Sequence, residues 1–447
     1  MTTSSDTTVE LTVEALSEYG EGISFWQGYE VYLQGVLPGE TALVQIGDPF
    51  TAGTKRRPGT VISVIKKSEC RRQKVCPYSE KCGGCPLGLM NYESQLMTKR
   101  GLVINALNAA GISEDNLVSY VKSPVTSFWR NKSIRYFAKD DKGCLTSGFF
   151  ASRSHQLVQI TSCEAEPVWF GDVSEGLCSL FSTLGFSSHG KTSRGLRALL
   201  LRDCSAGRLG LLISSRDLSQ SEFQLLRDFA AQHNFASFSF LLNQNEGNAL
   251  LQGRMRLIYG QDTVTTIIGP FSYEVGPQTF LQVNHTVTEE LYNDAIAWCG
   301  SGTSALDLCC GIGTMTLRLA LNFAKVTGIE IVSASCAAAL KNARKNGLDN
   351  VDFVTADIRK GLGKWIRPEI DAVIADPSRA GLGEESCSAL GKLKSGSRLC
   401  YIFCSLTALK RDIPVLLRNG FTVSKVKAYD MFPYSLMTET AVFMVKK

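Results

Sequence analysis

Two residues near the C-terminal end of the sequence could together carry out nucleophilic chemistry on a pyrimidine. Cys404 ends the apolar stretch "RLCYIFC", and Glu439 begins the last apolar stretch, "ETAVFMV". A thiolate that adds to carbon 6 of uracil turns carbon 5 into a nucleophile, which can accept a methyl group from a sulfonium donor. A carboxylate can then remove the proton from carbon 5, so that the thiolate leaves. Taken singly, Cys404 is better explained as a core cysteine and Glu439 as a surface acid.

A second group of residues is typical of a nucleotide-like cofactor site. Gly311 and Gly313 follow the apolar strand "ALDLCC", where they let the backbone approach a ligand closely. Glu330 ends the second strand, where a carboxylate can accept hydrogen bonds from both ribose hydroxyls. Asp357 and Asp376 end the third and fourth strands, on the sheet edge where open α/β sheets bind ligands. Any one acid alone is better explained as a helix cap or a solvated loop acid, but the set indicates an adenosine-type cofactor.

The glycine pattern favours one cofactor over another. The third glycine of the dinucleotide fingerprint is missing, and what remains is the pattern of methyltransferases, so S-adenosylmethionine fits better than a nicotinamide. Cys404 ends the fifth strand of the same predicted sheet. We therefore expect it on the same edge as Asp376.

Three cysteines have the spacing of a metal site. Cys76, Cys82 and Cys85 form C-x5-C-x2-C, and "CGGC" allows a tight backbone turn round a sulfur-bound centre. The spacing alone leaves a zinc site and an iron–sulfur cluster equally open, and a fourth ligand is required. Cys70 is nearby but lies in a basic run, and we interpret it as a bystander. Fifteen cysteines in a chain that begins without an export signal favour reduced thiols over a disulfide framework.

Charge is distributed unevenly along the chain. The net charge is only +5, but residues 51–100 hold 11 Lys and Arg against 3 Glu, and the run "KKSECRRQK" spans residues 66–74. This run is either a phosphate-binding patch or a solvated basic loop. No apolar run approaches the ~20 residues that cross a bilayer. The sequence thus predicts a cytoplasmic protein with no membrane segment.

The length of 447 residues suggests about three domains. We expect a disordered tail over 1–8 and a small antiparallel barrel of five strands, or a sandwich, over 9–66, because short alternating runs there are separated by Gly, Pro and Asp. Residues 92–111 have helical periodicity. Residues 125–268 are mixed, with one helix at 220–232. From about 303, strands alternate with helices at 314–323, 333–346 and 407–418, the pattern of a doubly wound α/β sheet.

Several stretches together resemble the RNA uracil-5-methyltransferase family, and the likeness covers nearly the whole chain. They include "VLPGE" (36–40), "CPYSEKCGGCPLGLMNYESQLMTK" (76–99), "FWRNKSIRYF" (128–137), "TFLQVN" (279–284), "DPSRAGL", "CSLTALKRD", and "DMFP" followed by Glu439. The nearest type is the member that has an N-terminal TRAM domain and an iron–sulfur cluster and acts on large-subunit ribosomal RNA.

This resemblance implies a fold and a division into domains. The fold is a Rossmann-like S-adenosylmethionine methyltransferase sheet with an OB-like TRAM barrel and a central α+β domain. The implied domains are the barrel at 9–68, the central domain with the cluster at 69–91 and 125–262, and the methyltransferase domain at 92–124 and 263–447.

The resemblance also implies roles for individual residues. Cys404 matches the family nucleophile and Glu439 its base. Cys163 matches the distant fourth cysteine, so that Cys76, Cys82, Cys85 and Cys163 would hold a 4Fe-4S cluster, interpreted as a staple of the fold. The implied contacts to S-adenosylmethionine are Gln282, Cys309, Thr314, Glu330, Asp357 and Asp376.

The sequence departs from the family pattern around the nucleophile and the base. The Asn-Pro that usually follows the nucleophile is Ser405-Leu406, and Asp-Pro-Pro-Arg has Ser378 in place of its second proline. The family commonly has two histidines between "DMFP" and the base, and this sequence has Tyr434 and Met437 at those positions. These changes put the turnover rate and the choice of uridine in doubt.

RNA binding is expected on two surfaces. Phe25 and Trp26 could stack on bases or belong to the barrel core. A second surface would combine Arg130, Lys132 and Arg135 with Trp129 and Tyr136. The target uridine must be flipped out of its stack. The full set of candidate RNA-binding residues is Lys66, Lys67, Arg71, Arg72, Arg130, Lys132 and Arg379.

The sequence therefore predicts a monomeric, S-adenosylmethionine-dependent RNA uridine C5-methyltransferase that acts on 23S ribosomal RNA. One alternative is a methyltransferase of the transfer RNA T-loop. Another is an iron–sulfur RNA-binding protein with impaired catalysis. An adenine or cytosine methylase is disfavoured, because "DPSR" lacks the aromatic residue of amino-methylases and no second Pro-Cys pair supplies a cytosine nucleophile.

Overall fold

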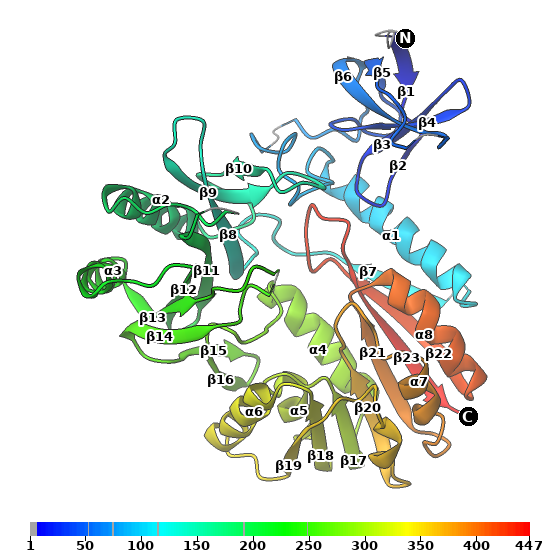
Figure 1. Cartoon of the computed structure of the whole chain (residues 1–447). Helices are drawn as coiled ribbons and strands as arrows, with labels where there is room; N and C mark the ends of the chain where they lie inside the picture. Colours follow the sequence, from blue (N-terminus) through cyan, green and yellow to red (C-terminus); the bar gives the residue numbers. More distant parts are fainter. Residues whose placement is uncertain (1–6, 52, 74–75, 114–115, 191–192, 248) are drawn as a thin grey trace.

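The N-terminal part of the chain folds into a six-stranded curled sheet. The computed structural model describes residues 7–447 except 52, 74–75, 114–115, 191–192 and 248, so most of the expected tail lies outside the described residues. The strand order is β1-β5-β6-β4-β3-β2 (Figure 1). The strands are β1 (Thr8–Thr12), β2 (Ala15–Leu16), β3 (Gly22–Trp26), β4 (Tyr29–Leu33), β5 (Thr41–Ile46) and β6 (Arg56–Lys66). The sequence predicted five strands, and the sixth is the short β2, which pairs with β3.

A cysteine-bearing segment of turns leads from this sheet into a long helix. Helix α1 (Tyr92–Ala109) begins where the Asn91 side chain accepts a hydrogen bond from the Ser94 backbone N–H at 2.9 Å. Its Val103 and Leu107 pack on Leu409 and Leu416 of helix α8 (Leu406–Arg418), so α1 lies against the C-terminal sheet (Figure 1). The helix expected at 92–111 is confirmed.

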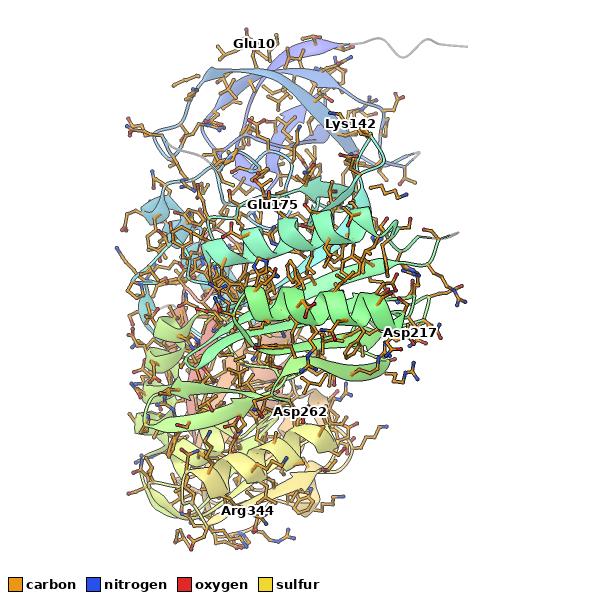
Figure 2. All side chains as sticks on the ribbon, turned by 90° about the vertical axis from the view of Figure 1, so that its left-hand side faces the viewer. Glu10, Lys142, Glu175, Asp217, Asp262 and Arg344 are labelled. Carbon is orange, nitrogen blue, oxygen red and sulfur yellow. The ribbon has the colours of Figure 1, made fainter. Side chains whose placement is uncertain are left out.

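The middle of the chain is a seven-stranded sheet with two helices on one face. Its order is β10-β9-β8-β11-β12-β13-β14. The strands are β8 (Lys132–Lys139), β9 (Leu145–Phe150), β10 (Leu157–Gln159), β11 (Leu196–Cys204), β12 (Gly207–Ser214), β13 (Phe235–Leu242) and β14 (Arg254–Gly260). Figure 2 shows α2 (Val168–Thr183), which carries Glu175, and α3 (Gln220–Gln232) running across this sheet.

The expectation of a single helix in this region is wrong, because α2 was missed. Helix α2 begins at Pro167 without a side-chain cap, so the usual sequence signal for a helix start is absent. Its apolar positions Phe170, Val173, Leu177 and Phe181 nevertheless recur at helical spacing and are buried. The helical periodicity could therefore have been recognised in the sequence. It was not, because the segment also contains aromatic and β-branched residues that favour a strand.

The C-terminal part is an eight-stranded sheet of order β19-β18-β17-β20-β21-β23-β22-β7, which confirms the doubly wound α/β class. The hairpin of β15 (Val264–Ile268) and β16 (Phe271–Val275) connects it to the middle sheet. The strands are β7 (Leu117–Val121), β17 (Gly302–Leu308), β18 (Phe323–Glu330), β19 (Val351–Thr355), β20 (Ile370–Ala375), β21 (Arg398–Phe403), β22 (Phe421–Tyr429) and β23 (Glu439–Lys446). Strands β17 to β21 are parallel, and β23 runs antiparallel to β21 and β22.

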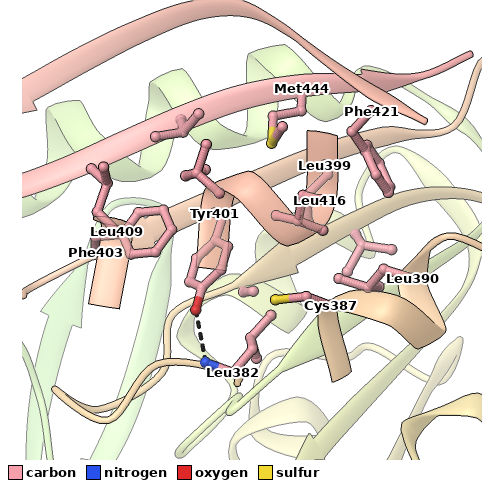
Figure 3. Packing of buried hydrophobic residues seen from close by; sticks show 14 of the residues in the cluster. Leu382, Cys387, Leu390, Leu399, Tyr401, Phe403, Leu409, Leu416, Phe421 and Met444 are labelled. Atoms are coloured by element: carbon pink, nitrogen blue, oxygen red, sulfur yellow. Dashed lines mark hydrogen bonds between the residues drawn. The ribbon is translucent and has the colours of Figure 1, made fainter. Parts of the chain in front are cut away.

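Helices cover both faces of this sheet, which is why its central strands read as nearly continuous apolar runs. One face packs on α4 (His285–Cys299), α5 (Thr314–Leu319) and α6 (Ser333–Lys345). The other packs on α1, α7 (Glu384–Leu390) and α8, and Figure 3 shows part of that core. Within it the Tyr401 hydroxyl donates to Asp412 at 2.6 Å and accepts from the Leu382 N–H at 2.7 Å. Helix α5 ends at Leu319, earlier than expected, because the chain turns there to begin β18.

Among the described residues, no helix has the length and apolar character that crossing a membrane requires.

Candidate active site

A cavity of about 670 Å³ lies at the carboxyl ends of the central strands of the C-terminal sheet. Parallel strands end at one edge, so residues that follow β17, β18, β20 and β21 meet there. Of the residues predicted from the sequence, the cavity wall contains Gln282, Cys309, Glu330, Asp357, Asp376, Arg379, Cys404 and Glu439. The structure thus brings the expected cofactor residues and the expected reactive pair into one space.

The turn after β17 forms one wall of this cavity. Cys309, Gly311 and Gly313 all have positive φ angles, of 65°, 55° and 87°, so the backbone folds back tightly. The Gly311 N–H donates to the Glu330 carboxylate at 3.1 Å, and the Val332 N–H donates to the other oxygen of that carboxylate at 2.9 Å. Glu330 is therefore fixed between two strands at the edge of the cavity.

Thr314 does not line the cavity. It begins α5, and its hydroxyl lies 3.2 Å from the Tyr292 hydroxyl, while its carbonyl accepts from Tyr273 at 3.3 Å. It therefore supports the turn from behind.

Asp376 and Gln282 form a polar contact on the cavity wall. The Gln282 amide donates to the Asp376 carboxylate at 3.3 Å. Burial raises the pKa of Asp376 to about 6, while the hydrogen bond from Gln282 acts in the opposite direction. Asp357 accepts a hydrogen bond from the Arg359 backbone N–H at 3.1 Å.

Strand register brings Cys404 and Glu439 together. Phe403, the last residue of β21, pairs with Thr440 of β23, so Cys404, which follows β21, comes opposite Glu439, the first residue of β23. The Cys404 sulfur lies 3.9 Å from the Pro377 carbonyl oxygen. Burial, and then the nearby charges of Glu439 and Asp376, raise the pKa of Cys404 to about 12. The resting sulfur is consequently a thiol, which is less easily oxidised than a thiolate.

Glu439 is a buried acid without a full set of partners. Its side chain is 2% exposed, and its Oε2 atom has no hydrogen-bond partner among the described residues. Burial and then Asp376 raise its pKa to about 8, and Arg379 opposes this shift. An unpartnered carboxyl that titrates near neutral pH at a cavity wall can accept a proton from a bound molecule.

The loop between β22 and β23 is held by helix α1 and by the cysteine-bearing segment. The Lys99 ammonium of α1 lies 2.5 Å from Asp430 and donates to the Phe432 carbonyl at 2.9 Å. The Tyr434 N–H donates to Gln95 of α1, and the Tyr434 carbonyl accepts from the Leu87 N–H of the cysteine-bearing segment, both at 2.9 Å. These bonds connect the loop that precedes Glu439 to both α1 and the cysteine segment.

The residues that depart from the family pattern lie in different parts of the site. Tyr434 is buried under the Arg72 guanidinium, whose centre lies 4.6 Å from the ring, and it has a φ of 67°. Met437 lines the cavity and accepts from Arg379 at 3.1 Å. Ser378 is exposed at the cavity mouth. Ser405 caps α8, where the Ala408 N–H donates to its hydroxyl, and Leu406 is the first residue of that helix.

The four predicted metal-binding cysteines lie near one another, although Cys76 and Cys163 are far apart in sequence. Burial, and then Cys163, Cys82 and Cys76, raise the pKa of Cys85 to about 12. Among the described residues, no three His, Cys, Asp or Glu side chains converge closely enough to hold a metal ion.

The structure corrects several candidate RNA contacts. Arg71 forms a two-bond ion pair with buried Glu40 and Arg72 pairs with Glu164, so both have internal partners. Arg135 is buried in an ion pair with Glu166, and Trp129, which precedes β8, is buried too.

The remaining candidates divide between surface and interior. Lys66, Lys67 and Arg379 are exposed, as is Phe25 at 54%, whereas Trp26 packs against the core of the N-terminal sheet. Arg130 is half-buried beside Trp129, and Lys132 is half-buried on the middle sheet.

Sequence reasoning missed three parts of the site. Phe280 and Gln278 line the cavity beside Gln282, and Lys99 holds the β22–β23 loop. Phe280 could have been found, because it stands two residues before the cofactor candidate Gln282 in "TFLQVN", and the structure leaves it 67% exposed. Lys99 gave no such signal, since a lysine in an amphipathic helix is usually exposed.

The fold and the cavity define a class, an S-adenosylmethionine-dependent methyltransferase. Residues 300–425 match a family described as "Methyltransferase domain". A tRNA (uracil-54, C5)-methyltransferase of Pyrococcus abyssi, solved with S-adenosyl-L-homocysteine, shares the fold with a TM-score of 0.79 over 98% of this chain and 99% of its own, at 22% identity.

Sequence relatives cover the chain from end to end. A 23S rRNA (uracil(1939)-C(5))-methyltransferase, RlmD, of Shewanella frigidimarina is 31% identical over 97% of this chain and 95% of its own. An uncharacterized RNA methyltransferase of Halalkalibacterium halodurans is 25% identical over 97% and 96%. The chain therefore belongs to the RNA uracil-C5 methyltransferase family, and it is an RNA methyltransferase.

The raised pKa of Glu439 gives a prediction about stability. The unfolded chain loses this proton near pH 4.5 and the folded chain near pH 8, so wild-type stability falls between these values, because the unfolded chain ionises there while the buried carboxyl must keep its proton. Glu439→Gln removes this cost. We expect its melting temperature to exceed that of the wild type by about 2–4 °C at pH 8.

The comparison is made by thermal unfolding at several pH values from pH 5 to 8. The difference between variant and wild type should grow as the pH rises. A variant that is less stable than the wild type at every pH would contradict the buried, unpartnered state of Glu439. Glu384→Gln, which replaces an exposed acid of α7, serves as the control.

Proposed function

We propose that this enzyme transfers a methyl group from S-adenosylmethionine to carbon 5 of one uridine in 23S ribosomal RNA. The observation that carries the proposal is the shared cavity, in which a cysteine and an unpartnered acid meet beside a row of strand-end acids. The choice of RNA is supported by two Shewanella relatives, 31% and 30% identical, that are named as 23S rRNA (uracil(1939)-C(5))-methyltransferases.

The cavity wall has the residues that such a cofactor requires. When bound, S-adenosylmethionine supplies an electrophilic methyl group on a sulfonium sulfur. Glu330 is placed to accept from ribose hydroxyls, and Gln282 offers an amide beside Asp376. The residues that would hold the cofactor are Gln282, Cys309, Glu330, Asp357 and Asp376, with Thr314 supporting them from behind.

The proposed reaction uses Cys404 and Glu439 in turn. The Cys404 sulfur releases its proton to solvent as it bonds to carbon 6 of the flipped uracil, and the ring electrons move toward the oxygen on carbon 4. Carbon 5 then bonds to the methyl group with its electron pair, while the bond from the methyl group to the sulfonium sulfur breaks and leaves its pair on that sulfur. The Glu439 carboxylate removes the carbon 5 proton, the ring double bond reforms, and the Cys404 thiolate is expelled. A base with a pKa of about 8 is well matched to neutral pH.

A covalent trap tests these roles and excludes a binding protein without catalysis. RNA with 5-fluorouridine at the target position should form an adduct with the wild type that survives denaturing gels, because fluorine cannot leave as a proton. Cys404→Ser should form no adduct and lose at least ~10³-fold in kcat, since the hydroxyl is a far poorer nucleophile.

Glu439→Gln should accumulate the adduct on ordinary RNA, because formation remains but release is blocked. Cys400→Ser replaces a buried cysteine of β21, four residues before Cys404, and controls for the general loss of a thiol. Full methylation by Cys404→Ser would overturn the mechanism.

The substrate is tested by mapping 5-methyluridine in a strain that lacks the gene. We expect one 23S position to lose its methyl group, with the position equivalent to uridine 1939 as the first candidate, and transfer RNA to be unchanged. Loss in the transfer RNA T-loop with intact 23S methylation would establish the alternative substrate. Complementation with the Cys404→Ser variant should fail.

We further propose that Cys76, Cys82, Cys85 and Cys163 hold a 4Fe-4S cluster. Such a cluster would bind four thiolates at once and tie the segment at 76–85 to the middle sheet. The methyl transfer has no redox step, so we assign the cysteines a structural role. That segment contacts the loop before Glu439 through Leu87 and Tyr434, so its order bears on the active site.

Removing one cysteine tests this assignment. Cys82→Ser should lose bound iron and acid-labile sulfide and melt at a lower temperature, because the segment loses its cross-link. Cys70→Ser, a neighbouring cysteine outside the set, should keep its iron. An iron-free Cys82→Ser chain with unchanged melting temperature and full activity would contradict the structural role, and zinc in place of iron in the wild type would contradict the cluster.

A further inference from the structure

Two cations face each other on the middle sheet. Lys132 of β8 pairs directly with Arg202 of β11 in antiparallel register, so their side chains lie on the same face. This is the face of Ile134 and Leu200, which packs toward Val264 of β15 and not toward α2 and α3. The strand pairing therefore places two positive charges side by side on the side of the sheet nearer the C-terminal domain.

No acid balances these charges among the described residues. Arg202 is 2% exposed, and only its Nη2 atom has a partner, the Thr279 carbonyl at 2.5 Å, while Nε and Nη1 have none. Lys132 makes no hydrogen bond or ion pair within the described part of the chain. Burial and then Arg202 lower the pKa of Lys132 to about 8. Arg135, on the opposite face of β8, is by contrast fully paired with Glu166.

The arrangement is unfavourable for the folded chain alone. Like charges directly opposite each other in a sheet repel, and a buried cation without an anion has lost its hydration without compensation. Two of the three guanidinium nitrogens of Arg202, Nε and Nη1, are also left without hydrogen bonds. An anion from outside the chain that binds between Lys132 and Arg202 would balance both charges, which would explain why the two cations lie together.

Its position shows which anion would fit. Arg202 bonds Thr279, and Asn131, next to Lys132, donates to the Gln282 carbonyl at 3.0 Å, so the pair lies beneath the loop that carries Gln282 into the cavity. Neither cation lines the cavity itself, so a cofactor bound there would not supply the missing charge. Two rings on the same sheet, Tyr136 and Phe150, lie 4.5 Å apart and offer an aromatic surface nearby.

We propose that Lys132 and Arg202 form a binding site for one backbone phosphodiester of the substrate RNA, beside the uridine that enters the cavity. A phosphate there would accept charge-assisted hydrogen bonds from both side chains and neutralise their repulsion. The inference rests on RNA being the substrate. It adds Arg202, which the sequence did not single out, to the candidate RNA-binding residues.

Lys132→Gln tests the site, with Lys139→Gln as the matched control. Lys139 lies at the other end of the same strand and is exposed. Binding of a fluorescein-labelled single-stranded RNA with one uridine is measured at several KCl concentrations. Lys132→Gln should weaken binding roughly tenfold and lower the slope of log affinity against log salt by about 0.7. Lys139→Gln should match the wild type.

Stability separates this role from a structural one. Because Lys132 has no anionic partner in the free chain, Lys132→Gln should melt at the same temperature as the wild type or higher. Its affinity for S-adenosyl-L-homocysteine should be unchanged. A lower melting temperature, a weaker affinity for that cofactor product, or an unchanged salt slope would each overturn the proposal.

A scan of the RNA backbone locates the contact. Uncharged methylphosphonate is placed at one linkage at a time, and a single linkage near the uridine should weaken wild-type binding more than the binding of Lys132→Gln, which keeps Arg202. Equal sensitivity of both proteins at every linkage would refute the site. These readouts are of binding alone, so they decide the proposal even if the 23S substrate proved wrong.

Discussion

The geometry of the site depends on one buried ion pair, between Lys99 of α1 and Asp430 at the end of β22. Both side chains are fully removed from solvent, and the Tyr92 hydroxyl donates to the second carboxylate oxygen of Asp430 at 2.7 Å. A buried pair adds little net stability, yet the loss of one partner costs about 3–5 kcal/mol. Its effect is to fix position. It sets where the β22–β23 loop starts, and thereby where Met437 and Glu439 meet the cavity.

The reactive end of the cavity is held in an electrostatically costly state. Cys404, Glu439 and Asp376 line one cavity, and each has a raised pKa because burial opposes its charged form. Arg379, at the mouth, is the cation that moderates this field. Such clustering of groups that resist ionisation is typical of sites that accept and return protons, and strand register enforces it here.

Much of this arrangement could be predicted from the sequence because it follows from local rules. Glu330, Asp357 and Asp376 are acids at or just after the ends of parallel strands. Such acids must meet at one edge of the sheet, and all three line the cavity there. The errors arose where tertiary pairing decides the outcome. In the sequence, Arg71 and Arg135 have the pattern of RNA contacts. In the folded chain they form ion pairs with Glu40 and Glu166, which are distant in sequence. Lys99 was overlooked because its partner lies at the far end of the chain.

Strand β7 has a consequence for how the enzyme is assembled. It comes before the whole middle sheet in sequence, yet Tyr120 pairs with Ala428, so the edge of the C-terminal sheet is completed by an early segment and a late one. Closing so long a loop is slow and entropically unfavourable, and little rewards it until β22 exists. During synthesis, α1 and the cysteine segment must therefore wait for the last strands to emerge. A chain that stops short of β22 lacks a partner for β7 and Asp430 for Lys99, so incomplete products cannot build the cavity.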